Sequence, residues 1–145
     1  MTNAKQHVVV GVDGSPSSVQ ALRWAADYAA ATGADLVAVT AWQVPSGMGS
    51  GAAVLPGEDF ENAAWEVVDK ALATAAVAPT TRIVERGDPA TVLLDHAKDA
   101  DLLVVGSRGH GEVSEVLLGS VSHRCVHHAT CPVVVVRAPQ SQHGN

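Results

Sequence analysis

The chain has 145 residues, of which 47% are hydrophobic and 17% charged, enough apolar material for the core of a single domain. Its formal net charge is -6 and its Lys and Arg residues are scattered, which argues against a nucleic-acid-binding protein. The first residues are polar, and no run of about 18 uncharged apolar residues occurs, so we expect neither a signal peptide nor a membrane span and predict a cytoplasmic protein.

The first part of the chain predicts two strands, each followed by a helix. A β-branched run predicts a strand over 7–12 that ends at Asp13. Ser15 has the side chain of a helix N-cap and Pro16 suits the first helical position, so a helix is expected from there to Gly33. A second strand is predicted over 35–42, a glycine-rich surface loop over 43–57 and a second helix over 58–77. The buried stripe of that helix is expected to contain Ala64, Val67, Val68, Ala71, Leu72 and Ala75.

The rest of the chain continues the same alternation. A short strand is predicted over 81–85, and Asp88 as cap with Pro89 in the first turn begins a third helix. Its shared face is expected to contain Val92, Leu93, His96 and Ala97. A fourth strand over 101–105, a helix that begins near Gly119 and ends before Cys131, and a fifth strand over 133–136 follow. Residues 138–145 predict a polar, frayed tail, which leaves an ordered core of about 6–138 in one domain over 1–145.

Alternating strands and helices predict an α/β fold in three layers, with a parallel sheet covered by helices on both faces. Ligands of such sheets bind at the carboxyl ends of the strands. The two unusual loops, 11–15 and 106–111, both lie at that edge, and they face one pocket if the first and fourth strands are neighbours. Ala38, Val39 and Thr40 would then offer an apolar wall and backbone groups to a flat heterocycle such as adenine.

The second of these loops carries the strongest functional signal of the sequence. It reads Gly106-x2-Gly109-x9-Gly119-Ser120 and joins an apolar strand to a helix. Glycines let backbone N–H groups approach an anion, and a helix N-terminus adds unpaired amides and partial positive charge. The loop is neither a Walker loop, which needs a Gly-Lys-Ser or Gly-Lys-Thr, nor the dinucleotide fingerprint. A phosphate site without that lysine suggests binding more than hydrolysis.

With this spacing, and with the opening 10–15 and the closing 131–136, the chain resembles the single-domain, ATP-binding branch of the universal stress protein family over essentially its whole length. The resemblance implies a Rossmann-like, adenine-nucleotide-hydrolase-like sheet of five strands in the order 3-2-1-4-5. It also implies a homodimer formed through the fifth strand, Val133, Val134, Val135 and Val136. That strand is uncharged and would be a sheet edge, which favours pairing with another chain.

The resemblance also implies the site. Residues 106–112 with Ser120 and Val121 would hold the phosphates of ATP, Asp13 would lie near the ribose and any phosphate-bound Mg²⁺, and Val39 would contact adenine. The nucleotide-binding residues expected in this way are Gly11, Val12, Asp13, Ser15, Val39, Gly106, Ser107, Arg108, Gly109, His110, Gly111, Glu112, Gly119, Ser120 and Val121.

Several of these residues also have structural explanations. Asp13 and Ser120 are both good helix caps, and an exposed loop arginine such as Arg108 is usually solvated. His123 and His127 lie four residues apart on a predicted helix, but the neighbouring Cys125 points elsewhere and no zinc-binding pattern supports a metal site. The two cysteines, Cys125 and Cys131, are expected to be reduced, without a structural disulfide between them. Hydrolase motifs are absent.

The sequence therefore predicts an ATP-binding stress regulator that responds to nucleotide and has little or no ATPase activity, although Asp13 with Mg²⁺ could support slow hydrolysis. Two alternatives remain open. The same pocket could bind cyclic AMP, or the chain could be a dimeric interaction module for which nucleotide is irrelevant.

Overall fold

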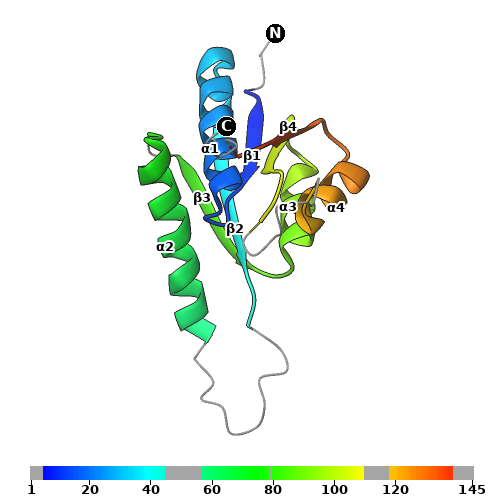
Figure 1. Cartoon of the computed structure of the whole chain (residues 1–145). Helices are drawn as coiled ribbons and strands as arrows, with labels where there is room; N and C mark the ends of the chain where they lie inside the picture. The colour runs from blue at the N-terminus through cyan, green and yellow to red at the C-terminus, as the bar shows by residue number, and fades with distance from the viewer. Residues whose placement is uncertain (1–4, 45–56, 79, 110–117, 139–145) are drawn as a thin grey trace, which may run out of the picture.

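The computed structural model describes residues 5–44, 57–78, 80–109 and 118–138. Strands and helices alternate along the chain as predicted (Figure 1). The strands are β1 His7–Gly11, β2 Asp35–Trp42, β3 Thr81–Arg86, β4 Leu102–Gly106 and β5 Val133–Val136. The helices are α1 Pro16–Thr32, α2 Gly57–Ala75, α3 Pro89–Ala97 and α4 Ser120–His128.

The strands form one parallel sheet in the order β3-β2-β1-β4-β5, which confirms the expected fold. Within it, β1 pairs with β2 on one side and with β4 on the other, so that Val10 lies opposite both Ala38 and Val104. Because the strands are parallel, the loops that follow β1 and β4 leave the same edge of the sheet side by side. This is the arrangement that a single pocket requires.

The helices cover both faces of the sheet, α1 and α2 one face and α3 and α4 the other (Figure 1). Alternate residues of each strand enter the two cores: Val8 and Val10 pack with α1 and α2, whereas Val9 packs with α3 and α4. The expected stripe of α2 is buried or nearly so, and Val92, Leu93 and Ala97 of α3 are buried. None of the helices in the described ranges combines the length and apolar character needed to cross a membrane.

The ends of some elements differ from the predictions. The strand predicted over 7–12 ends at Gly11, although the Val12 N–H still donates to the Val39 carbonyl at 2.8 Å, and β3 extends one residue further, to Arg86. The helix predicted over 58–77 ends at Ala75, because Ala76 has a left-handed backbone with φ 56°. Glycine usually occupies that conformation, so an alanine gives no sequence signal for the end of the helix.

The N-termini of α1 and α4 are built differently. Ser15 caps α1 as predicted, since its side chain accepts from the Ser18 N–H, and Pro16 is the first residue of that helix. The expectation that Ser120 caps α4 is wrong: Gly119 is the N-cap residue, without a side-chain hydrogen bond, and Ser120 is already helical. Most of the predicted loop over 43–57 and nearly all of the tail over 138–145 lie outside the described residues.

Candidate functional site

A pocket lies at the carboxyl ends of β1 and β4, where the sequence predicted a ligand site. It is lined by several of the predicted residues, namely Gly11, Val12, Asp13, Val39, Gly106, Arg108, Gly109 and Val121. It is also lined by residues that the sequence did not predict as part of the site: Ser18, Ala41, Pro89, Leu93, Val105 and Ser122. The loops after β1 and β4 thus contribute to one site, together with the starts of α3 and α4.

The wall formed by β2 differs from the predicted one. Val39 lines the pocket with Ala41, whereas Ala38 packs into the core on the opposite face of the sheet. Thr40 is buried, and its hydroxyl donates to the Val12 carbonyl at 2.8 Å. Side chains alternate along a strand, so a pocket on one face receives every second residue. This alternation could have identified Ala41 in place of Ala38 and Thr40.

Gly11 has a packing role at the floor of the pocket. A Cβ on Gly11 would lie 2.8 Å from Leu93 Cδ1, closer than any real contact of this kind. The glycine therefore makes room for a leucine of α3, and both residues line the pocket. The pocket floor is consequently apolar.

Asp13 lies beside the glycine-rich loop that follows β4. Its Oδ1 accepts from the Ser15 N–H at 2.9 Å, and a Cβ on Gly109 would lie 2.8 Å from Oδ2. Asp13 therefore fixes the turn before α1, while Ser15 is the residue that caps the helix; the interpretation of Asp13 as the cap is wrong. The side chain of Asp13 is exposed, so its carboxylate is accessible at the mouth of the pocket.

Ser107 connects the two ends of the glycine-rich motif. Its N–H donates to the Val136 carbonyl at 2.8 Å, and its own carbonyl accepts from the Gly119 N–H at 2.6 Å and from the Ser122 hydroxyl at 3.0 Å. The backbone N–H and carbonyl of Ser107 are thus both hydrogen-bonded within the protein. Ser107 and Gly119 do not line the pocket, and their hydrogen bond holds the start of α4 against the residue that follows β4.

The start of α4 is suited to an anion. Val121 and Ser122, in its first turn, line the pocket, no acidic residue occurs in that turn, and Gly119 supplies no capping side chain. By contrast, α1 and α3 are capped by Ser15 and Asp88. Backbone N–H groups in the first turn of a helix, with the partial positive charge of the helix N-terminus, favour a negatively charged group.

Asp13 and Arg108 are the charged residues among the described residues that line the pocket. Close to its rim, Asp88 caps α3 and forms an ion pair with Arg124 of α4 at 2.6 Å. The hydrogen bond from the Thr91 backbone holds the pKa of the Asp88 carboxyl below its usual value, assisted by the Thr91 hydroxyl and by Arg124. The Asp88–Arg124 pair therefore connects the two helices that flank the pocket.

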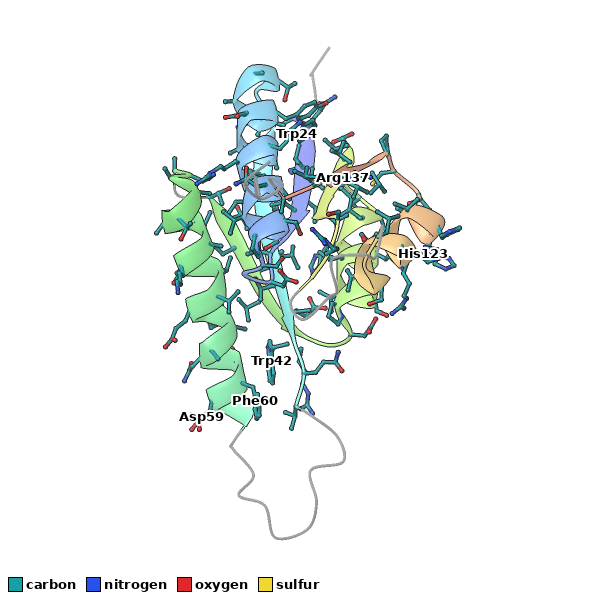
Figure 2. The ribbon with its side chains drawn as sticks, viewed as in Figure 1. Trp24, Trp42, Asp59, Phe60, His123 and Arg137 are labelled. Atoms are coloured by element: carbon teal, nitrogen blue, oxygen red, sulfur yellow. The ribbon has the colours of Figure 1, made fainter. Side chains whose placement is uncertain are left out.

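Among the described residues, Ser15 and Ser120 were also predicted but do not line this pocket. Ser15 contributes to the cap of α1, and Ser120 is exposed on the first turn of α4. His110, Gly111 and Glu112 lie outside the described residues. His123 points away from the body of the protein on α4 (Figure 2), and no metal-binding group of three or more His, Cys, Asp or Glu occurs in the described ranges. Cys125 and Cys131 are free thiols, as predicted.

The comparisons with known proteins agree on the family. Residues 5–137 match the model of the Universal stress protein family. A universal stress protein of Mycolicibacterium smegmatis is 40% identical over 139 residues, which cover 90% of this chain and 45% of the relative. The chain thus spans about half the length of the curated relatives it matches.

Solved structures show the same fold. The universal stress protein UspA from Lactobacillus plantarum has a TM-score of 0.73 and 25% identity, with 93% of this chain and 100% of that chain covered. A universal stress protein solved in complex with cAMP has a TM-score of 0.66 and 31% identity, with 94% of this chain and 100% of that chain covered. The match to the family model and the identity to its members lead to one conclusion: this chain belongs to the universal stress protein family.

Proposed function

We propose that this protein binds ATP at the carboxyl edge of its sheet and acts as a nucleotide-responsive stress regulator. The observation that carries the proposal is the convergence of Gly109, Val121 and Asp13 on one pocket, although they come from three separate segments of the chain. The similarity to a universal stress protein solved with cAMP supports an adenine nucleotide as the ligand class.

In this proposal the base lies over the apolar part of the pocket. Val39, Ala41 and Leu93 offer hydrocarbon surface, which suits a flat heterocycle. The phosphates extend toward Gly109 and the first turn of α4, where backbone N–H groups favour an anion. Arg108 lines the same part of the pocket and adds a positive charge.

Asp13 suits a divalent cation that accompanies the nucleotide. Its Oδ1 is hydrogen-bonded to Ser15, while Oδ2 faces the loop at Gly109. A carboxylate oxygen is the ligand type that Mg²⁺ prefers, usually with waters and substrate phosphates as the other ligands. In this proposal Asp13 would hold Mg²⁺ against the phosphates, and the ion would offset the repulsion between carboxylate and phosphate.

We expect hydrolysis to be slow or absent. Rapid phosphoryl transfer needs several positive groups around the transferred phosphoryl group and a residue that positions the attacking water. Arg108 is the cation that lines the pocket in the described part of the chain, and no lysine joins it there. The site thus resembles a binding site more than the active site of an ATPase.

Calorimetric titration of nucleotide-stripped protein with ATP and Mg²⁺, and with cyclic AMP and GTP as competitors, tests the proposal. We expect ATP to bind, GTP to compete poorly and phosphate release to be slow. In Asp13→Asn, Mg²⁺ should no longer increase the affinity for ATP. Asp35→Asn is the matched control, because it makes the same charge change at the start of β2, at the amino ends of the strands and away from the pocket. Absence of binding by every nucleotide would refute the proposal.

Cyclic AMP is the second candidate ligand, favoured by the 31% identical protein solved with cAMP. It would use the same apolar wall but only one phosphate group. A higher affinity for cyclic AMP than for ATP in the same titration would make it the ligand and change the signal that the protein senses.

We further propose a homodimer through β5. The four valines of this edge strand are all half-buried, and none of them is charged. The opposite edge strand, β3, contains Arg82, Glu85 and Arg86, charges that discourage edge-to-edge pairing. If nucleotide fails to bind, a dimeric interaction module is the function that remains. We expect it to act in the cytoplasm, where free thiols such as Cys125 and Cys131 are usual.

A further inference from the structure

Ser17 lies in the first turn of α1 and is almost completely buried, with 3% of its surface exposed. Its hydroxyl contacts both backbone polar groups of Arg108, which lies far away in the sequence. Ser17 Oγ donates to the Arg108 carbonyl at 2.5 Å and accepts from the Arg108 N–H at 3.3 Å. One side chain of α1 thus fixes one residue of the glycine-rich loop that follows β4.

The absence of a side chain at Gly106 makes this contact possible. A Cβ there would lie 2.5 Å from Ser17 Oγ and 2.7 Å from both Ser17 C and Ser18 N. Two of these are backbone atoms, which cannot move aside as a flexible side chain can. The first glycine of the motif therefore lets α1 approach the end of β4, and this approach brings Ser17 to Arg108.

The contact has a consequence for the next residue. A trans peptide group is planar, with its C=O and N–H pointing in opposite directions. The Arg108 carbonyl and the Gly109 N–H belong to one such group, and Ser17 holds that carbonyl toward α1. The Gly109 N–H must then point away from α1. Within the described residues it has no hydrogen-bond partner, and Gly109 lines the pocket.

We infer that Ser17 is a positioning residue that aims the Gly109 amide at a phosphate of the nucleotide. The inference rests on the proposed function. Ser15 is a weaker contributor, because its hydroxyl reaches the same carbonyl at 3.3 Å while its oxygen also accepts from the Ser18 N–H. Ser17 makes the shorter bond and also holds the Arg108 N–H, so it is the main contact that orients the Arg108–Gly109 peptide group.

The test compares Ser17→Ala with a control that loses a similar bond elsewhere. Thr80→Val is that control. The Thr80 hydroxyl, just before β3, donates to the Leu36 carbonyl of β2, and neither residue lines the pocket. In Ser17→Ala without ligand, hydrogen exchange at the Arg108 amide, which donates to Ser17, should accelerate. ATP affinity should fall by about tenfold, or about 1.4 kcal/mol, whereas the affinity for adenosine, which has no phosphate, should stay the same. Thr80→Val should change neither affinity nor exchange at this amide.

Unchanged ATP affinity in Ser17→Ala would overturn the inference, as would equal losses for ATP and adenosine, which indicate a general distortion of the pocket. If Ser17→Ala does not fold, Ser17→Cys retains a side chain of similar shape with a weaker hydrogen-bonding group and should give the same selective loss in smaller measure. If the wild-type protein binds no nucleotide, the proposed function and the positioning role both fail. If the wild type binds ATP and the variants bind it equally well, only the positioning role fails.

Discussion

Gly109 lies directly against the carboxylate of Asp13, since a Cβ on Gly109 would approach Asp13 Oδ2 to 2.8 Å. The neighbour is the end of a flexible side chain, so Gly109→Ala should displace Asp13 and leave the fold intact. We expect it to reduce ATP affinity by about tenfold, with a change of less than about 1 kcal/mol in the free energy of unfolding. The larger Gly109→Val should abolish binding. Titration calorimetry and urea unfolding measure the two effects, and wild-type affinity in Gly109→Val would refute the phosphate-loop assignment.

Gly106→Ala, unlike Gly109→Ala, should mainly reduce the stability of the fold. Here the added Cβ would meet backbone atoms of Ser17 and Ser18, so α1 must shift as a whole. Overpacking of this kind costs about 1–3 kcal/mol, and we expect a value near the upper end, measured by urea unfolding. Gly109→Ala serves as the comparison. If the two alanine variants are equally stable, Gly106 does not have the packing role described here.

The Asp88–Arg124 pair predicts a dependence on pH. Asp88→Asn retains a capping side chain for α3 but loses the charge next to Arg124. The folded protein lowers the pKa of Asp88, so its charge stabilises the native state above the ordinary pKa of about 3.9, and this contribution is lost as the pH falls through the lowered value. The wild type should therefore be more stable than the variant at pH 7, by less than about 1 kcal/mol because the pair is exposed.

Urea unfolding of the wild type and Asp88→Asn at pH 7, 5 and 3 measures this difference. It should be constant between pH 7 and 5 and diminish toward pH 3 and below. Lys5 and Asp35 form a comparable exposed pair at the amino ends of the strands, so Asp35→Asn is the control for a general charge effect. A difference that increases as the pH falls would contradict the prediction.

The proposed dimer through β5 can be tested by substitutions in the strand itself. Static light scattering should give twice the monomer mass for the wild type at micromolar concentration. Val135→Lys places a charge on the uncharged edge and should give a monomer. Thr81→Lys adds the same charge to β3, at the opposite edge, and should leave the dimer unchanged. A monomeric wild type would refute the proposed dimer.

The sequence predicted the fold because its local signals agree with one another. Strands that are apolar on both faces, Ser15 and Asp88 as caps, and Pro16 and Pro89 in first turns all favour the same alternation of strands and helices. The end of α2 was mispredicted because Ala76 adopts a left-handed backbone without the glycine that usually marks it. Such a position depends on the surrounding structure.

The site was predicted only in part. The glycine pattern and Asp13 were found because they form continuous motifs, but Pro89, Leu93 and Ser122 enter the pocket from helices that are distant in the sequence. Their positions depend on the sheet order and on helix packing. The role of Ser17 was missed for the same reason, since a serine in a first helical turn is unremarkable until Arg108 is placed beside it.

The backbone around the base of the pocket is already hydrogen-bonded to itself. The Val12 N–H bonds to the Val39 carbonyl, and the Val12 carbonyl accepts the Thr40 hydroxyl. The N–H of Val12 and the hydroxyl of Thr40 are therefore not available as donors to a purine bound as proposed, and the side chains that it meets here are mainly apolar. In the proposed complex, selection of one purine over another therefore depends on polar groups at the rim of the pocket. The affinity for the base depends on its contacts with the methyl groups of Val39, Ala41 and Leu93.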